Sequence, residues 1–442
     1  MLEISSSAAK ALSMLWQNRF EAYLAGGCVR DMLMGLAPKD WDIATNATPQ
    51  QVKAVFQDKR VVETGIKHGT VTVLIDNEPV EVTTFRKDIG YSDNRHPDSV
   101  VFTSTLKEDV SRRDFTMNAL AFCPERGVID YFGGSEDIVA QTIRCVGDAD
   151  CRFNEDALRI LRALRFSAVL GFSIERETEV SIRKNKELLR SVSAERINAE
   201  LTKLICGRNA GVVLGEFTGV IGVVIPEILP MVCFDQHSKY HCFDIWRHTI
   251  ETMENSKPTH ILRWAALLHD TGKPDCFSLG PDGVGHFYGH AVLSKQKADN
   301  VMRRLKFDNA TRERVLTLIE YHDISFIPEV KAIKRYLNRF GKDTLLQLLQ
   351  LKHADILGHA PQYHCRIQEI EQAQNVAEQV IAEESCFSLR DLAVNGNDII
   401  AVGLEGKEVG VALDFLLNAV IDEQVSNERA QLLEYLGENL IH

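Results

Sequence analysis

The segment Tyr23-Leu24-Ala25-Gly26-Gly27-Cys28-Val29-Arg30-Asp31, followed by Asp40-Trp41-Asp42, decides how the first part of the chain folds. The apolar residues before the Gly-Gly pair predict a β-strand, the glycines predict a tight turn, and the following residues predict the start of a helix. A helix start offers free backbone N–H groups and the positive end of a dipole to a phosphate. The segment therefore predicts a small α/β unit in which Gly26 and Gly27 are candidates for binding phosphate.

Asp40 and Asp42 form a second candidate site. Residues i and i+2 of a strand share a face, so both carboxylates would point the same way while Trp41 packs behind them. Two neighbouring carboxylates repel each other unless a cation neutralises them, and oxygen ligands favour Mg²⁺. A pair of ions could activate a hydroxyl group and stabilise a leaving pyrophosphate. An exposed Asp-x-Asp in a loop is the alternative interpretation.

Two further features accompany this pair of carboxylates. Thr48-Pro49-Gln50-Gln51 predicts a helix start with a capping box, which places strand, site and helix in order. Glu81 lies on an alternating apolar and polar strand at 80–85 and could supply a third carboxylate; a solvated strand glutamate is the alternative.

Together, the Gly-Gly-x-Val-Arg-Asp segment and Asp-x-Asp resemble the catalytic core of the class II tRNA nucleotidyltransferases, the CCA-adding enzymes and bacterial poly(A) polymerases of the polymerase β superfamily. The resemblance implies an α+β fold, with an N-terminal polymerase β-like head followed by a mostly all-α neck, an HD domain and a helical tail. It implies template-independent addition of CCA to the 3′ end of tRNA from CTP and ATP. In that reaction Asp40, Asp42 and Glu81 would be catalytic, with Mg²⁺ on the two aspartates, and Gly26, Gly27 and Arg30 would hold the triphosphate.

The octapeptide Arg112-Arg113-Asp114-Phe115-Thr116-Met117-Asn118-Ala119 resembles a second motif of this family. The resemblance implies that Arg112, Arg113, Asp114 and Asn118 contact the triphosphate and the ribose of the incoming nucleotide. Guanidinium groups suit phosphate oxygens, and an aspartate that accepts from a 2′-hydroxyl would reject a deoxynucleotide. The alternative, in which the arginines only pair with nearby Glu108 and Asp109, is reasonable for one arginine.

Glu155, Asp156 and Arg159 resemble the nucleotide-selecting motif of the family. We expect a helix that begins at Glu155 under an Asn154 cap, so that the three side chains share one face. Cytosine and adenine both present an amino donor beside a ring-nitrogen acceptor, which a carboxylate and a guanidinium complement, whereas uracil and guanine invert that order. A first-turn acidic pair that only stabilises the helix is the alternative.

Further along the same helix, Arg162 and Arg165 are candidates for nucleotide or RNA contacts, against the alternative of a solvated face. The segment 195–201 resembles the next helical motif, to which we assign a structural role in bracing the selecting helix. The polar segment 86–98 lacks periodicity and predicts a loop; in the family it resembles the flexible loop of enzymes that add the terminal A.

A second cluster of ligand-type residues follows in the helical part of the chain. His248, His269-Asp270 and Asp355 resemble the metal ligands of an HD domain, a metal-dependent phosphohydrolase module, with His290 and His322-Asp323 as further candidates. Imidazole and carboxylate ligands suit Mn²⁺, Fe²⁺, Ni²⁺ or Mg²⁺. A retained fold that has lost this chemistry is the alternative.

These motifs predict four segments, which are a catalytic head at 1–150, a selecting and neck region at 151–230, an HD-type domain at 231–370 and a tRNA-binding tail at 371–442. An A-adding enzyme or a poly(A) polymerase is the rival in the same class. A phosphohydrolase or RNA-binding protein with an inert head is the rival in another class.

Composition bounds these interpretations. The 442 residues carry 50 basic and 62 acidic side chains, a net charge of −12, which argues against binding nucleic acid by bulk positive charge but allows a local basic groove. The apolar run 211–225 is too short to cross a bilayer and contains Glu216. Ten cysteines without a Cys-x-x-Cys pair predict mostly buried thiols in a reducing compartment. We expect a cytoplasmic protein with no membrane partner.

Overall fold

The computed structural model describes residues 3–63, 65–66, 69–89, 99–103, 105–383 and 385–440. The chain divides into two compact units, Met1–Pro226 and Glu227–His442, and each is described by itself. The finer division into four segments stays a prediction. None of the helices in the described ranges combines the length and the apolar character that a bilayer crossing needs.

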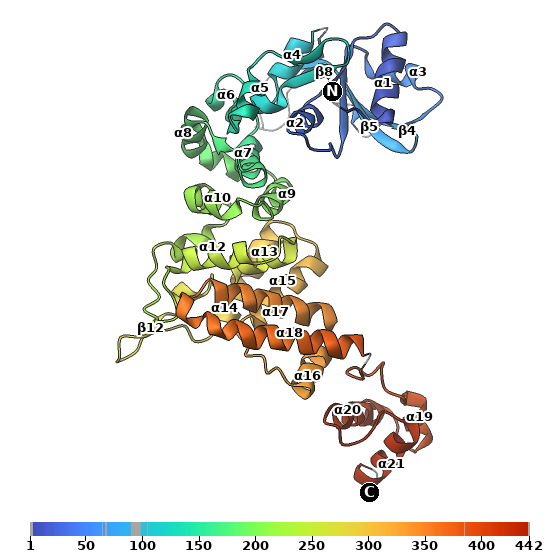
Figure 1. Cartoon of the computed structure of the whole chain (residues 1–442), viewed down its shortest axis with the longest axis vertical. Coiled ribbons are helices and arrows are strands. Elements are labelled where there is room, and N and C mark those ends of the chain that lie inside the picture. Colours follow the sequence, from blue (N-terminus) through green and yellow to red (C-terminus); the bar gives the residue numbers. More distant parts are fainter. Residues whose placement is uncertain are drawn as a thin grey trace. The chain divides into compact units, whose positions relative to one another are not determined.

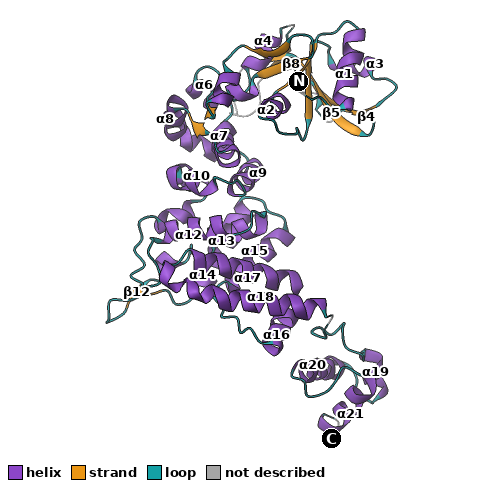
Figure 2. Ribbon diagram, in the orientation of Figure 1, coloured by secondary structure: helices purple, strands orange, loops and turns teal. Residues whose placement is uncertain are grey.

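A seven-stranded mixed sheet organises the start of the first unit, in the order β3-β4-β5-β2-β1-β8-β9 (Figures 1 and 2). Its strands are β1 (Ala22–Ala25), β2 (Trp41–Thr45), β3 (Arg60–Val62), β4 (Thr70–Ile75), β5 (Glu78–Thr84), β8 (Leu120–Cys123) and β9 (Gly127–Asp130). The pair β2 and β5 is parallel and the other pairs are antiparallel. Strand β1 is buried along its whole length because it lies inside the sheet.

Short helices connect and cover these strands. They are α1 (Ser6–Gln17), α2 (Gly27–Leu33), α3 (Pro49–Val55), α4 (Leu106–Ser111) and α5 (Gly134–Val139). Helix α3 begins with the predicted capping box, since the Thr48 hydroxyl accepts from the Gln51 N–H and the Gln51 side chain accepts from the Thr48 N–H. One face of the sheet packs into an apolar cluster that includes Tyr23, Phe85 and Val110.

The prediction of an irregular loop over 86–98 is wrong at its start. Residues 86–89 form strand β6 (Arg86–Ile89), which pairs antiparallel with β7 (Ser99–Phe102). The remainder of that predicted loop, 90–98, lies outside the described residues.

The rest of the first unit is mainly helical, as predicted. It contains β10 (Thr142–Ile143), α6 (Ala149–Glu155), α7 (Leu158–Leu170), β11 (Ser173–Ile174), α8 (Arg176–Asn185), α9 (Ala194–Ile205), α10 (Ala210–Glu216) and α11 (Thr218–Val224). The expected helix start at Glu155 is wrong, because α6 ends there and Asp156 is extended, with φ −143° and ψ 101°. Its Oδ1 accepts from the N–H of Leu158 and starts α7, whereas Asn154 donates to the Asp150 carbonyl within α6.

The second unit is also helical. Its elements are α12 (Ile245–Asn255), α13 (His260–Leu268), β12 (Ser278–Leu279), β13 (Gly285–His286), α14 (His290–Arg304), α15 (Asn309–Tyr321), α16 (Val330–Phe340), α17 (Lys342–Leu357), α18 (Ile367–Ala382), α19 (Gly396–Ala401), α20 (Lys407–Ile421) and α21 (Arg429–Asn439). Residues 186–191, 226–231, 273–275 and 361–366 are 3₁₀ turns in the two units.

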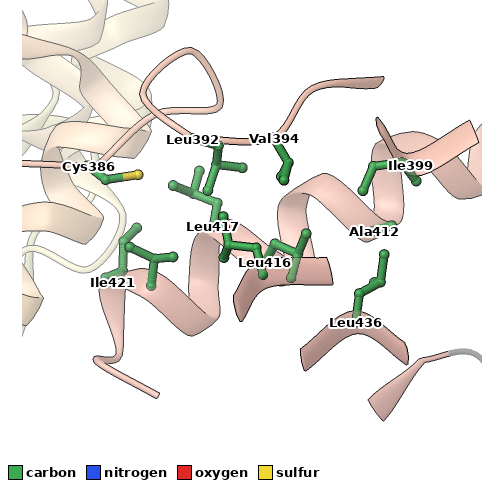
Figure 3. Packing of buried hydrophobic residues seen from close by; sticks show 11 residues of the cluster. Cys386, Leu392, Val394, Ile399, Ala412, Leu416, Leu417, Ile421 and Leu436 are labelled. Atoms are coloured by element: carbon green, nitrogen blue, oxygen red, sulfur yellow. The ribbon is translucent and has the colours of Figure 1, made fainter. Parts of the chain in front are cut away.

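The last of these helices share an apolar core. Figure 3 shows side chains of α19, α20 and α21 packing against Cys386, Leu392 and Val394, which precede α19. All ten cysteines are free thiols. Only Cys28, Cys123, Cys145 and Cys386 are buried, so the prediction that most are buried is wrong.

Candidate functional site

A cavity of about 400 Å³ opens in the first unit where the head meets α7. Eleven of its twelve lining residues are ones that the sequence singled out, drawn from five separate segments. The lining residues are Gly27, Arg30, Asp42, Arg112, Arg113, Asp114, Asn118, Asp156, Arg159, Arg162, Arg165 and Phe166. Phe166 is the lining residue that sequence reasoning missed, although it directly follows Arg165 on the predicted helix.

The carboxylates of the head meet at the edge of this cavity. Asp42 on β2 is paired in register with Glu81 on the parallel strand β5, and Asp40 lies immediately before β2. Burial raises the pKa of Asp42 to about 6, a value that includes the lowering effect of the Arg113 charge and the raising effects of the Glu81 and Asp40 charges. The site therefore carries an excess of negative charge around a partly desolvated aspartate.

The same three carboxylates are the candidate metal ligands of the head. Within the described ranges, no side chain donates a hydrogen bond to the carboxylate oxygens of Asp40, Asp42 or Glu81, which leaves them available; Cys28 donates only to the backbone carbonyl of Asp42. A metal site needs several potential ligand atoms close together. Among the described residues, however, every group of three His, Cys, Asp or Glu side chains with such atoms within 4.8 Å of one another lies in the helical second unit. The donor chemistry of the head fits Mg²⁺, while its carboxylates alone do not complete a ligand set.

Arg113 lies directly over the backbone of Gly26. Gly26 has φ +85°, and a Cβ there would stand 2.1 Å from Nη1 of Arg113, so only glycine fits. Nη1 of Arg113 also donates to the Asn118 carbonyl at 3.4 Å. Arg112, which also lines the cavity, donates to buried Asp109 at 2.8 Å.

Asp114 is the centre of the polar network in the cavity. Its Oδ2 accepts from Nε of Arg162 at 2.8 Å and lies 2.6 Å from Nη2 in the same ion pair, and its Oδ1 accepts from the Phe115 N–H and from Nδ2 of Asn118 at 2.8 and 3.0 Å. Burial would raise the pKa of Asp114, but the charge of Arg162 and these hydrogen bonds outweigh it and lower the pKa to about 2. The carboxylate is ionised, and three hydrogen bonds together with the charge of Arg162 engage both of its oxygens.

Three guanidinium groups surround the ring of Phe166. The guanidinium carbon of Arg165 lies 3.9 Å from the ring centroid, and those of Arg30 and Arg162 lie 5.1 and 5.5 Å away. Arg30 is oriented further by Asn118, whose Oδ1 accepts from Nη1 at 2.8 Å, and by its neighbour Asp31. Cation–π contacts and hydrogen bonds thus hold several positive charges toward one cavity.

The predicted selecting residues lie together at the corner between α6 and α7, with different partners from those expected. Arg159 donates from Nη1 to Glu155 at 2.6 Å and from Nη2 to the Arg112 carbonyl at 2.9 Å. Asp156 accepts from Nη2 of Arg196 at 2.7 Å. The expectation that all three side chains share one helical face is therefore wrong, because the helix is interrupted at Asp156.

Helix α9 braces α7 through buried charge, as its structural role predicted. Glu200 is 7 % exposed, and its Oε2 lies 2.7 Å from Nε of Arg165 while its Oε1 lies 3.8 Å from Nη1 of Arg162. Arg162 and Arg165 are thus paired and partly buried, so the alternative of a solvated face does not apply to them.

The second unit brings together the four predicted ligands of the other cluster. Nε2 of His248, on α12, lies 3.1 Å from Oδ1 of Asp355 on α17 and 3.5 Å from Oδ2 of Asp270. Nε2 of His269 lies 3.2 Å from Oδ2 of Asp270 and 3.7 Å from Oδ1 of Asp355. All four residues are buried. Asp270 and Asp355 line a second cavity of about 400 Å³, which His241, His290, His322 and His359 also line in part.

Positive side chains offset the negative charge of the two buried aspartates in this cluster. Burial would raise the pKa of Asp270, but His269 and Lys273 hold it well below its ordinary value, and Lys352 and His248 do the same for Asp355 against burial. Burial would lower the pKa of His269, yet the two aspartates raise it to about 10. A proton on His269 or a bound cation would satisfy the same carboxylates.

Comparisons with known proteins identify the family of this chain. Residues 22–144 match the family model of the poly A polymerase head domain, residues 171–228 match the probable RNA and SrmB-binding site of polymerase A, and residues 287–436 match tRNA nucleotidyltransferase domain 2. The CCA-adding enzyme of Lactobacillus johnsonii is 33 % identical over 444 residues, which cover 99 % of this chain and 98 % of that protein. The CCA-adding enzyme of Latilactobacillus sakei is 51 % identical over 202 residues, covering 45 % of this chain and 50 % of the relative.

Solved structures give the same result. The crystal structure of the Bacillus stearothermophilus CCA-adding enzyme in complex with CTP superposes with a TM-score of 0.72 at 30 % identity, over 98 % of this chain and 96 % of that one. The Thermotoga maritima CCA-adding enzyme complexed with tRNA shares the fold, with a TM-score of 0.59 at 19 % identity over 98 % and 94 % of the two chains. With one relative matched over nearly its full length and the motif residues gathered in one cavity, this chain belongs to the family of CCA-adding enzymes.

Proposed function

We infer that the protein adds CCA to the 3′ end of tRNA from CTP and ATP without a nucleic-acid template. One observation carries this inference, namely the cavity that gathers the phosphate, ribose and base motifs beside Asp42. The relative with the TM-score of 0.72 is a CCA-adding enzyme in complex with CTP, which supports a nucleotide in this cavity. The substrates tRNA, CTP and ATP support a cytoplasmic location.

Asp40 and Asp42, with Glu81 beside them, would hold Mg²⁺. When bound, the ions supply positive charge that favours deprotonation of the attacking hydroxyl and stabilises the leaving pyrophosphate. The chain contributes a concentrated negative charge at the end of β2, where the raised pKa of Asp42 reflects burial and the repulsion between the carboxylates. Phosphate oxygens of the nucleotide would complete the ligand set that the protein leaves incomplete.

In this proposal the 3′-hydroxyl of tRNA attacks the α-phosphate of the nucleotide in line, and pyrophosphate leaves. Gly26, Gly27, Arg30 and Arg113 would hold the triphosphate, since Arg30 and Arg113 are positioned at the cavity by Asn118. Asp114 would accept from the ribose hydroxyls. Because Arg162 and Asn118 already engage its two oxygens, a ribose hydroxyl would compete with them for the carboxylate.

Asp156 and Arg159 would select the base, with Glu155 fixing Arg159. Two N–H groups of Arg159 are bonded to Glu155 and the Arg152 carbonyl, and one is bonded to the Arg112 carbonyl. That arrangement leaves two of the five guanidinium N–H groups to donate to a ring nitrogen, while Asp156 accepts from the amino group of C or A. A uracil or guanine edge would meet acceptor with acceptor and donor with donor, which costs about 1–3 kcal/mol for each unsatisfied buried group.

In this proposal each of the four segments of the chain has its own role. Residues 1–150 form the catalytic head, 151–230 the selecting and neck region, 231–370 the metal-binding domain and 371–442 a tail that binds tRNA. The separate apolar core around α20 supports a tail that folds around its own centre (Figure 3).

One assay tests the nucleotidyltransferase function. Transcripts of tRNA that end before CCA, after C and after CC are offered to the protein with CTP, ATP or both. We expect C, then C, then A to be added, and Asp42→Asn to abolish every addition. Incorporation of A alone, and only after CC, would contradict CCA addition in favour of an A-adding enzyme, and long A tails would indicate a poly(A) polymerase.

We propose a second activity, metal-dependent phosphate-ester hydrolysis, in the helical unit. It is supported by the convergence of His248, His269, Asp270 and Asp355 at one buried point, two of which also line a cavity. The test measures release of nitrophenol from mono- and bis-p-nitrophenyl phosphate with Mn²⁺, Ni²⁺, Fe²⁺ or Mg²⁺. We expect hydrolysis that His248→Ala abolishes and Asp42→Asn leaves intact; equal hydrolysis by His248→Ala would contradict it.

A further inference from the structure

Three arginines meet at one aromatic ring in the wall of the cavity of the first unit. The guanidinium carbons of Arg30, Arg162 and Arg165 all lie within 5.5 Å of the ring centroid of Phe166. Arg162 and Arg165 precede Phe166 on α7, whereas Arg30 comes from α2, directly after the Gly-Gly turn. The ring therefore joins the phosphate-binding segment of the head to the helix that carries the selecting arginine.

The packing around Phe166 fixes the plane of its ring. Phe166 is 5 % exposed, and its ring meets that of Phe115 nearly at right angles, with the centroids 5.9 Å apart. Edge-to-face contacts of this kind hold two rings in a defined orientation. Phe115 is itself fully buried, and its N–H donates to Asp114. The ring of Phe166 is thus held at a fixed position among the guanidinium groups.

Like charges this close together repel one another. Burial lowers the pKa of Arg165, and the charge of Glu200 opposes this effect. The charges of Arg162 and Arg30 lower the pKa further. The face of an aromatic ring carries negative electrostatic potential and attracts a guanidinium group, most strongly where water is excluded. Phe166 therefore offsets part of the repulsion that gathering three arginines creates.

A ring also holds a guanidinium group without using its hydrogen-bond donors. A carboxylate accepts from the N–H groups, whereas an aromatic face attracts the cation as a whole. Three of the five N–H groups of Arg30 donate to Asp31 and Asn118. Among the described residues, no hydrogen bond engages the other two, or the terminal nitrogens of Arg165, which pairs with Glu200 through Nε. These free donors belong to residues that line the cavity, and they suit the oxygens of a triphosphate.

We propose that Phe166 is a positioning residue for the triphosphate of the incoming nucleotide, because its ring holds Arg30 and Arg165 toward the cavity by cation–π attraction. This inference rests on the proposed binding of nucleotide in the same cavity. The triphosphate is common to CTP and ATP, so weakening the ring's attraction should lower the affinity for both nucleotides alike.

Fluorination of the ring tests this electrostatic role while nearly preserving the shape of the side chain. Phenylalanines that carry one, two or three ring fluorines replace Phe166 in the full-length chain, since each fluorine withdraws electrons from the ring face. The Kd values for CTP, ATP and inorganic tripolyphosphate are measured by equilibrium titration with Mg²⁺. We expect all three to rise stepwise, to roughly tenfold with three fluorines. The kcat at saturating nucleotide should change much less, because the ring acts on binding.

The same series at Phe153 is the matched control. Phe153 is fully buried on α6, and within the described ranges no arginine or lysine lies over its ring. Its Kd values should stay at the wild-type level. Phe166→Leu keeps an apolar side chain but removes the ring, and it should raise Kd at least as much as three fluorines. If circular dichroism shows that this variant does not fold, the fluorinated series decides alone.

The outcomes separate the role of the ring from the function of the cavity. A fluorinated series with constant Kd would overturn the proposal, even if Phe166→Leu binds weakly, because the ring would then only fill space. Steps for CTP and ATP but not for tripolyphosphate would contradict it as well, since the ring would then act through the ribose or the base. An unmodified chain that binds none of the three ligands would overturn both this inference and the proposed binding of nucleotide.

Discussion

Oδ2 of Asp156 accepts a hydrogen bond from Nη2 of Arg196 at 2.7 Å, across forty residues of sequence. Asp156 is extended between two helices and lacks the support of a continuous helix. Its other oxygen accepts from the N–H of Leu158. Arg196 on α9 is therefore the side chain that fixes the direction of the proposed base-selecting carboxylate.

Arg196→Met should weaken base selection. Methionine keeps the unbranched length and the helix propensity of arginine but cannot donate to Asp156. Loss of a charged hydrogen bond costs about 1.5–3 kcal/mol, so we expect the ratio of kcat/KM for CTP over UTP to fall by roughly tenfold or more. Steady-state incorporation on transcripts lacking CCA measures this ratio.

Arg190→Met is the control for that substitution, since Arg190 is largely exposed and its ion pair among the described residues is with Glu187, three residues before it. The control should keep the wild-type ratio. An unchanged ratio in Arg196→Met would show that Asp156 is positioned without Arg196, or that it does not select the base.

Gly26→Ala should damage the site more than a comparable change elsewhere. Alanine is strained at φ +85°, and its Cβ would stand 2.1 Å from Nη1 of Arg113, so Arg113 must move. We expect a loss of at least about 1 kcal/mol in the free energy of unfolding and a raised KM for both nucleotides. Urea unfolding and nucleotide titrations measure the two effects.

Gly35→Ala separates backbone strain from the clash with Arg113. Gly35 has φ +70° and lies in an exposed turn after α2, where a Cβ would meet no other atom within 4 Å. The variant should lose stability through strain alone and keep the wild-type KM. Equal KM values for the two variants would contradict a role of Arg113 in binding nucleotide.

Local patterns predicted the pieces of the head better than the contacts between them. The period of two in Asp40-Trp41-Asp42 and the capping box at Thr48 are local features. The structure contains the cap and the strand, but the strand begins at Trp41, so the prediction that places Asp40 on it is wrong. The pairing of Asp156 with Arg196 is a tertiary contact that no local spacing encodes. The predicted helix start at Glu155 failed because the side chain of Asp156 itself accepts from Leu158 and interrupts the helix.

The metal-type cluster shows the same limit. Residue types and their order identified His248, His269, Asp270 and Asp355, and the structure brings all four together. Sequence alone offers no reason to place His290 and His322 beside one oxygen of Asp270, because that relation depends on where α14 begins and α15 ends.

Asp42 should make stability depend on pH when no divalent cation is present. Its pKa is about 6 in the folded chain against 3.8 ordinarily, so the folded state binds the proton more tightly than the unfolded state. Stability should therefore fall as the pH rises from about 4 to above 6, by up to about 3 kcal/mol from this residue. Asp42→Asn should be more stable than the wild type at pH 7.5, and this advantage should be smaller at pH 5.

Mg²⁺ provides the check on that interpretation. The ion binds the ionised carboxylate, so it should stabilise the wild type at pH 7.5, much less at pH 5, and Asp42→Asn little at either pH. Urea unfolding with and without Mg²⁺ measures these differences. A stability difference between the two proteins that does not change with pH would contradict the raised pKa.

Glu200→Gln should weaken the positioning of Arg162 and Arg165, which line the cavity. Glu200 is buried on α9 and holds Arg165 at 2.7 Å, while Arg162 lies 3.8 Å from its other oxygen. Glutamine keeps one acceptor but removes the charge that compensates two partly buried guanidinium groups, so we expect a loss of about 1.5–3 kcal/mol in the free energy of unfolding. Because Arg162 also holds Asp114, the KM for CTP and the KM for ATP should both rise.

Glu195→Gln, an exposed position on the same helix, is the control. Its free energy of unfolding should stay within about 0.5 kcal/mol of the wild type, and its KM values should not change. Urea unfolding and nucleotide titration of the two variants measure the contrast, and equal values for both would mean that α7 holds its arginines without the charge of Glu200.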